Sequence, residues 1–160
     1  MSTTTTRPAA WTGALLLALA GLLAGGAGAA RKPLVTTAQY AQLHANVLVT
    51  RSGRTLYHLS VERKGHFICT SSMCLSFWHP LLVPKGVEPT GSVPLGTIRR
   101  PNGTFQVAYR GEPLYTFAQD TRRGEAKGEG FKDVGVWRAA TVGAASPTSG
   151  SGSGGYGYGR

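Results

Sequence analysis

The sequence contains no apolar run long enough to cross a membrane. Its longest such run, residues 14–24, has eleven residues, whereas a transmembrane helix needs about 20. Arg7 precedes this run and small residues follow it, which is the pattern of a secretory signal. We therefore expect residues 1–30 to be a signal peptide that is removed, leaving an exported chain without a transmembrane span.

Acidic residues are scarce, because 7 Asp and Glu stand against 17 Lys and Arg. Removal of residues 1–30 takes away Arg7 and leaves 16 basic residues against 7 acidic ones, a net charge of +9. Such a charge attracts acidic envelope polymers without a dedicated site, so we expect these polymers as partners of the basic surface. Basic residues occur in scattered pairs such as Arg99–Arg100 without a nucleic-acid-binding motif, so no specific nucleic acid is expected.

Familiar catalytic and cofactor-binding motifs are missing as well. The sequence has no serine in a nucleophile elbow, no His-Glu metal helix and no phosphate-binding glycine loop. The glycines of residues 124–130 are expected to allow turns. We therefore expect a protein that is not an enzyme and has no cofactor; an enzyme of unrecognised type would need an activity that depends on Asp120.

Strand patterns dominate residues 33–142, a length that suits one domain. Two pairs of β-rich runs are each separated by a short turn, which predicts two hairpins: 46–50 with 55–59, and 95–100 with 104–109. A short helix is suggested only by residues 37–45. The predicted fold is all-β, a small antiparallel sheet or sandwich-like domain built from two related hairpin-containing units with little helix.

One of these runs alternates in polarity. Phe105, Val107 and Tyr109 share one side of the run 104–109, and the residues between them point the other way. This alternation predicts a strand with a single buried face.

Residues 143–160 consist mainly of glycine and serine and have no apolar periodicity, so we expect a disordered tail. Tyr156 and Tyr158 in this tail either contact an envelope glycan or belong to a plain extension.

The chain repeats itself at an offset of 58 residues. The repeat predicts two units, at about 46–83 and 104–142, that share a glycine, a Leu-Tyr strand, an acidic residue and a tryptophan. The matched positions are Gly53 with Gly111, Leu56 with Leu114, Tyr57 with Tyr115, Leu59 with Phe117, Glu62 with Asp120 and, after one inserted residue, Trp78 with Trp137.

Each acidic residue follows the end of a predicted strand, where a carboxylate accepts backbone N–H groups and shapes a turn. Paired acid–base catalysis by Glu62 and Asp120 is the less favoured alternative, because equivalent positions of a repeat need not converge. Trp78 and Trp137 are expected in the core or at its rim, rather than as ligand platforms.

These units resemble the secreted repeat of unknown function, a predicted lipoprotein family marked by a Tyr-x-(Phe/Trp/Tyr)-x-x-Asp motif. The second unit matches this motif with Tyr115, Phe117 and Asp120, whereas Leu59 and Glu62 depart from it in the first. The resemblance covers about residues 46–142 and implies an exported protein without an established activity. No cysteine near the signal is available for a lipid, since Cys69 is the first one.

The two cysteines lie in the segment 66–79. Export favours a Cys69–Cys74 disulfide. The alternative is a copper site, which would need free thiols and would use His66, Cys69, Met73, Cys74 and His79 as soft or borderline ligands. The Cys-x-x-x-x-Cys spacing lacks the Cys-x-x-Cys pattern of thioredoxin-like redox sites.

We therefore expect a secreted, periplasmic or cell-envelope protein with a binding or structural role and an unidentified specific partner. Extracytoplasmic copper binding through residues 66–79 is the alternative function.

Overall fold

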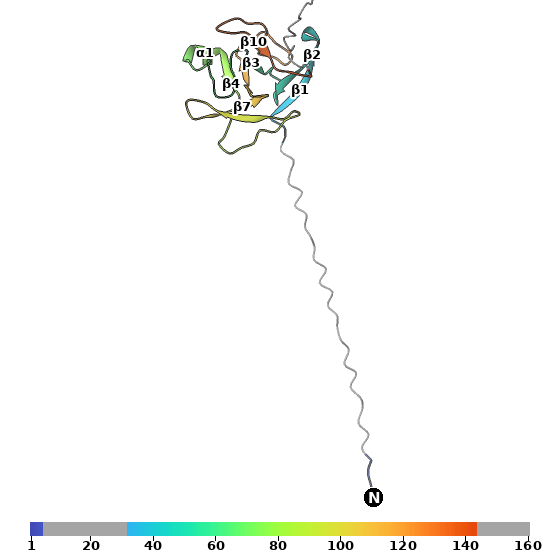
Figure 1. The fold of residues 1–160 in the computed structure, drawn as a ribbon. Coiled ribbons are helices and arrows are strands. Elements are labelled where there is room, and N and C mark those ends of the chain that lie inside the picture. The colour runs from blue at the N-terminus through green and yellow to red at the C-terminus, as the bar shows by residue number, and fades with distance from the viewer. Residues whose placement is uncertain (5–31, 144–160) are drawn as a thin grey trace, which may run out of the picture. The chain divides into compact units, whose positions relative to one another are not determined.

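The structure is a computed structural model that describes residues 1–4 and 32–143 (Figure 1). Residues 5–30 of the predicted signal peptide and 144–160 of the predicted tail lie outside the described residues. In the part that is described, no helix has the length and apolar character needed to span a membrane.

The regular secondary structure of residues 32–143 consists mainly of strands, so the predicted all-β fold with little helix is confirmed. Every pairing between the strands is antiparallel. The strands are β1 (Val35–Tyr40), β2 (Ala45–Thr50), β3 (Tyr57–Leu59), β4 (Trp78–Pro80), β5 (Leu82–Val83), β6 (Gly96–Arg99), β7 (Phe105–Tyr109), β8 (Glu112–Pro113), β9 (Tyr115–Phe117), β10 (Trp137–Ala139) and β11 (Thr141–Val142), with a 3-10 turn η1 (Ala41–Leu43) and the helix α1 (Ser72–Phe77).

The strands form three small sheets with the orders β1-β2-β11, β10-β3-β9-β4 and β5-β7-β6, and β8 pairs with β7. We call β10-β3-β9-β4 the central sheet. In Figure 1, α1 and the β1–β2 pair lie on opposite sides of it.

The central sheet exchanges strands between the two repeat units. Tyr57 of β3 pairs with Tyr115 of β9 at its middle. On the outside, Trp137 of β10 lies opposite Leu59, and Trp78 of β4 lies opposite Phe117. Each tryptophan strand therefore pairs with the Leu-Tyr strand of the other unit and not with that of its own.

The structure forms the hairpin expected from residues 95–109, with Thr97 opposite Val107 and Ile98 opposite Gln106. Its turn at 101–103 ends in Gly103, whose φ of 86° is easy only for glycine. The other hairpin forms only near its turn, where the Leu56 N–H donates to the Leu48 oxygen. Beyond Leu56 the chain leaves β2 and enters the central sheet, where Tyr57 pairs with Tyr115.

The helix is found at a different place from the one that the sequence suggested. Residues 37–45 do not form a helix, since β1 continues through β-branched Thr36 and Thr37 to Tyr40 and is followed by one 3-10 turn. The α-helix forms instead at Ser72–Phe77, where the Ser71 hydroxyl accepts the Cys74 N–H and caps the first turn.

The prediction of a single buried face for residues 104–109 is also wrong. Gln106 is fully buried and Ala108 nearly so, on the side expected to face solvent. The Gln106 amide donates to the Leu114 oxygen at 2.7 Å and its carbonyl accepts from Arg100. A polar side chain whose hydrogen bonds are formed in this way is stable inside the protein. The polarity of Gln106 alone therefore gave the wrong prediction that its side of the strand faces solvent.

Candidate functional site

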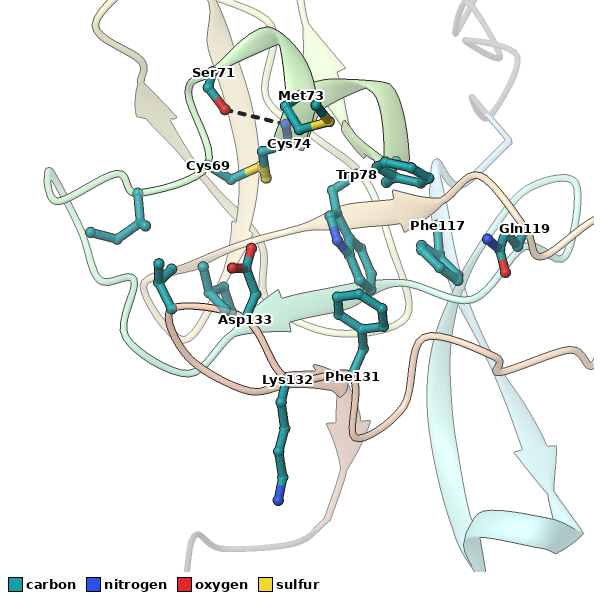
Figure 2. A pocket seen from close by; sticks show the side chains of 14 residues that line it. Cys69, Ser71, Met73, Cys74, Trp78, Phe117, Gln119, Phe131, Lys132 and Asp133 are labelled. Carbon is teal, nitrogen blue, oxygen red and sulfur yellow. Dashed lines mark hydrogen bonds between the residues drawn. A yellow bond between two sulfur atoms is a disulfide. The ribbon is translucent and has the colours of Figure 1, made fainter.

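A cavity of about 630 Å³ opens beside the central sheet, between α1, β4, β9 and the loop at 131–134. We call it the aromatic groove. Figure 2 shows the rings of Trp78, Phe117 and Phe131 gathered at its centre, with the Cys69–Cys74 disulfide above them. Its volume lies in the range of sites that hold small molecules.

The floor of the groove is a stack of aromatic rings. Trp78 lies parallel to Trp137 with ring centroids 3.7 Å apart, and it stacks on Phe117 at 4.4 Å. The Tyr57 ring meets the edge of Trp78 at 5.4 Å. Trp78 and Trp137 come from the two edge strands of the central sheet, β4 and β10, so this stack joins the two repeat units.

A glycine is required behind this floor. A Cβ added at Gly128 would lie 2.7 Å from a ring carbon of Trp78 and 3.1 Å from one of Tyr57. The Gly-rich segment 124–130 was expected to supply turns, and at this position it also lets the backbone approach the rings closely.

The rim of the groove exposes large apolar side chains to solvent. The exposed fraction is 72% for Met73, 43% for Phe77, 47% for Phe131 and 64% for Val134. Exposed large apolar side chains gathered around one cavity are typical of surfaces that bind ligands or partners.

A few polar groups interrupt this apolar lining. Ser71 and Gln119 stand at its margin together with Lys132 and Asp133. In Figure 2 the Asp133 carboxylate points toward the cavity, whereas the Lys132 side chain extends away from it. Asp133 is the one acidic side chain among the residues that line the groove in the described part of the chain.

The upper wall of the groove is a fixed loop. Cys69 and Cys74 form the predicted disulfide, with Cα atoms 5.5 Å apart. Glu62 Oε1 accepts the N–H groups of Ile68 and Cys69 at 2.7 Å each, and Arg100 donates to the Cys69 oxygen at 2.6 Å. A covalent bond and three charge-assisted hydrogen bonds therefore hold this wall in place.

The same loop does not offer the copper ligands that the alternative requires. Both sulfurs are in the disulfide, so neither is a thiolate. His66 and His79 are exposed, and within residues 1–4 and 32–143 no three His, Cys, Asp or Glu side chains cluster as metal ligands would. Met73 instead forms part of the rim of the groove.

The motif acids and tyrosines are paired across the two units. The Tyr57 hydroxyl donates to Asp120 Oδ2 at 2.6 Å, and the Tyr115 hydroxyl donates to Glu62 Oε2 at 2.8 Å. Asp120 Oδ1 also accepts the Lys127 N–H at 2.9 Å, so both acids hold a following loop by its backbone. All four side chains are buried.

Burial decides how these groups titrate. It raises the pKa of both tyrosine hydroxyls above their ordinary value, with the neighbouring carboxylate adding to the rise. Burial likewise raises the pKa of Asp120, although the hydrogen bond from Tyr57 opposes it. The tyrosines therefore remain protonated donors, and the carboxylates are occupied by fixed partners.

Arg100 completes the arrangement around Tyr115. It is almost fully buried, donates to the Tyr115 hydroxyl at 3.0 Å and also contacts Gln106. Its guanidinium lies 4.9 Å from the centre of the Phe67 ring. Through Tyr115 this cation faces the Glu62 carboxylate, and the pair balances charge inside the domain.

The remaining motif positions serve turns and packing. Gly53 and Gly111 adopt φ values of 82° and 81°. Leu56 and Leu114 are fully buried in a hydrophobic cluster separate from the aromatic one. Trp78 and Trp137 both belong to the aromatic core cluster, as expected, and Trp78 also lines the floor of the groove.

The sequence reasoning missed most of the rim. It named Met73 only as a metal ligand and did not select Phe77, Phe131 or Val134. Apolar residues in a glycine-rich loop follow no helix or strand periodicity, so a periodic pattern could not identify them. The one sequence feature that pointed to these rim residues was the presence of Phe131 and Val134 in a stretch without strand alternation.

Comparison with protein families gives one match, in which residues 96–141 fit the model described as a secreted repeat of unknown function. This match confirms the resemblance over the second unit, from β6 to the first residue of β11. Neither a curated protein nor a solved structure matches the chain.

Proposed function

Since residues 96–141 are a secreted repeat, we propose that this chain is an exported, non-enzymatic binding protein whose aromatic groove takes a small apolar or aromatic ligand. The observation that carries the proposal is the exposure of Met73, Phe77, Phe131 and Val134 around a cavity floored by Trp78 and Phe117. A ligand seated there would remove this surface from water, which is the principal source of affinity for apolar compounds.

The chemistry of the lining supports an aromatic or flat ligand in particular. A ring placed against the exposed side chain of Phe77 or Phe131 gains stacking energy in addition to burial, about 0.5–1.5 kcal/mol for each aromatic pair. Met73 adds a side chain that adapts its shape to irregular ligands. The few polar groups at the margin would orient such a ligand rather than bind it tightly.

The motif carboxylates support binding over catalysis. Glu62 and Asp120 each accept hydrogen bonds from a tyrosine and from backbone N–H groups, and both are buried. Their lone pairs are directed at fixed partners, so they serve the architecture that presents the groove.

We further propose that the protein works in the envelope or outside the cell, where its basic surface is drawn to acidic polymers. This attraction is long-range and needs no site. It would concentrate the protein at the envelope without using the groove.

The test is a titration with N-phenyl-1-naphthylamine, a neutral dye whose fluorescence rises in apolar sites. We expect saturable binding of one dye per chain. Phe131→Ser should weaken it about tenfold, because the lost contact of one half-covered phenyl ring is worth about 1–1.5 kcal/mol.

The matched control is Leu82→Ser, since Leu82 is 46% exposed and lies outside the groove. It should leave the dye affinity unchanged. Absence of saturable binding, or equal weakening by Phe131→Ser and Leu82→Ser, would overturn the proposed function.

A further inference from the structure

We propose that, in the absence of another ligand, the aromatic groove is occupied by residues 156–160 of the same chain, Tyr-Gly-Tyr-Gly-Arg. This inference rests on the proposed function, because it takes the groove to be a binding site. It adds a built-in competitor that an external ligand must displace.

The spacing in the sequence carries the first step. Tyr156, Tyr158 and Arg160 are two residues apart, with glycine between them. In an extended segment, side chains at i, i+2 and i+4 point to one side. Both rings and the guanidinium can therefore face the groove together, while the glycines let the backbone lie close to its walls.

The chemistry of the groove matches this order of side chains. The exposed rings of Phe77 and Phe131 at the rim are available to the tyrosine rings, and Ser71 and Gln119 at the margin offer partners for their hydroxyls. Two tyrosines bring roughly 300–500 Å² of aromatic surface. That quantity suits a cavity of about 630 Å³.

Charge supplies the second match. Asp133 lines the groove and its carboxylate points toward the cavity (Figure 2), while Lys132 turns away. Among the described residues, the Asp133 carboxylate takes part in no hydrogen bond or salt bridge, whereas Glu125 pairs with Lys127 and Glu129 with Arg138. An arginine two residues beyond the second tyrosine is placed to meet it.

The length of chain beyond the described fold is sufficient. The fold ends at Gly143, and Tyr156 follows 13 residues later. Thirteen residues span up to about 43 Å, whereas a domain of this size has a radius of gyration of about 13 Å. The segment can therefore reach any face of the domain.

Attachment to the same chain makes a weak contact effective. A short linker holds its ligand at an effective concentration in the millimolar range. A segment that binds the groove with a dissociation constant of about 1 mM as a free peptide would thus occupy roughly half of the molecules. The free peptide therefore needs only a modest affinity for the groove.

The experiment uses the methyl group of Met73 as a reporter in the full chain. The sequence has only two methionines, Met1 and Met73, and Met1 belongs to the segment expected to be removed. Labelling with ¹³C-methyl methionine therefore makes Met73 the reporter in the mature chain, and Met73→Leu confirms which signal comes from the groove. A tyrosine ring bound beside Met73 shifts this signal by its ring current.

We expect the Met73 signal to move in the variant Tyr156→Ser/Tyr158→Ser and to stay in place in the control Ser151→Ala/Ser153→Ala. The difference should not change when the protein is diluted tenfold. A synthetic peptide of residues 150–160 added to the double serine variant should return the signal toward its original position, and the same peptide with both tyrosines replaced by serine should not.

Identical Met73 signals in the full chain and the double serine variant would overturn the inference. A difference that disappears on dilution would also overturn it, because the segment would then enter the groove of a second copy. If the double serine variant binds N-phenyl-1-naphthylamine no more tightly than the unchanged chain while Phe131→Ser weakens binding, the tail does not compete and only this inference fails. If the dye binds no form of the protein, the proposed function itself is wrong.

Discussion

Replacing Tyr57 by phenylalanine tests whether the two repeat units are joined through their motif residues. The substitution removes one oxygen, which donates to Asp120 Oδ2 at 2.6 Å and accepts the Gly128 N–H at 3.3 Å. It leaves the ring in contact with Trp78. Any loss of stability therefore reports the hydrogen bonds and not a cavity.

The expected loss follows from the state of Asp120. Its carboxylate is buried and would keep only the Lys127 N–H as a donor among the described residues. A hydrogen bond to a charged group contributes about 1.5–3 kcal/mol, so we expect the free energy of unfolding to fall by about 2 kcal/mol at pH 7. For a domain of about this size the melting temperature should drop by roughly 8–16 °C, on the scale of 4–8 °C per kcal/mol.

The loss should shrink in acid. Burial already raises the pKa of Asp120 in the folded state, so ionised Asp120 costs stability above that pKa, and stability is regained as the pH falls through it. Removing the Tyr57 donor, which opposes this rise, raises the pKa further. The deficit of Tyr57→Phe should therefore be larger at pH 7 than in mildly acidic buffer.

The assay is urea unfolding arranged as two double-mutant cycles. Tyr57→Phe combined with Asp120→Asn should show a coupling energy of about 1–2 kcal/mol, whereas Tyr57→Phe combined with Glu62→Gln should be additive within about 0.5 kcal/mol. Glu62 is the matched control because it is the acid of the same unit as Tyr57. Coupling to Glu62 and none to Asp120 would refute the exchange of partners between units.

Three further predictions use other parts of the domain. Purified protein should contain no titratable thiols. Reduction of the Cys69–Cys74 disulfide should lower the free energy of unfolding by about 2 kcal/mol, the value for a closed loop of this length. Free thiols found by alkylation and mass analysis would contradict this prediction. Burial lowers the pKa of His58 in the folded state. As the pH drops below about 6.5, the unfolded chain therefore binds a proton at His58 before the folded chain does, and the stability of the fold decreases. His58→Gln should reduce this decrease in thermal melts, and an unchanged pH profile would argue against the role of His58. Gly128→Ala places a methyl group 2.7 Å from an indole carbon and should lower the free energy of unfolding in urea by about 1–3 kcal/mol. The control Gly96→Ala, whose added Cβ has no atom within 4 Å, should lower it much less. Equal losses of stability in the two variants would show that the close approach at Gly128 is not the cause.

The sequence predicted the fold class, because strand patterns and tight turns are local properties. The β6–β7 hairpin is the clearest case, since Pro101 and Gly103 define its turn without reference to the rest of the chain. The disulfide was predictable because export was expected and the sequence has only two cysteines.

The arrangement of the strands could not be predicted in the same way. The motif residues do not decide whether a tryptophan strand pairs with the Leu-Tyr strand of its own unit or with that of the other unit. The choice of partner strand and register depends on contacts between residues that are distant in the sequence. Gln106 illustrates the limit: its burial depends on Arg100 and Leu114, which the alternation of its own strand does not reveal.

The groove was beyond the sequence for a related reason. Its rim combines α1, which was not predicted, with Phe131 and Val134 from a loop that shows no periodicity. Its floor needs Trp78 and Phe117, which lie 39 positions apart and become neighbours through the pairing of β4 with β9. A site made by tertiary contacts between two repeats has no compact sequence motif.

The exchange of strands has a consequence for what one repeat is. The family match covers residues 96–141, which contain β9 and β10. The strands that pair with them, β4 with β9 and β3 with β10, lie outside this match. A fragment of this length would leave Tyr115 without Glu62, and Trp137 without Trp78 beside it. Because buried polar groups and aromatic faces without partners are costly, we expect the repeat to be half of a folding unit, which becomes stable only when a second repeat supplies the missing acid, strand and indole.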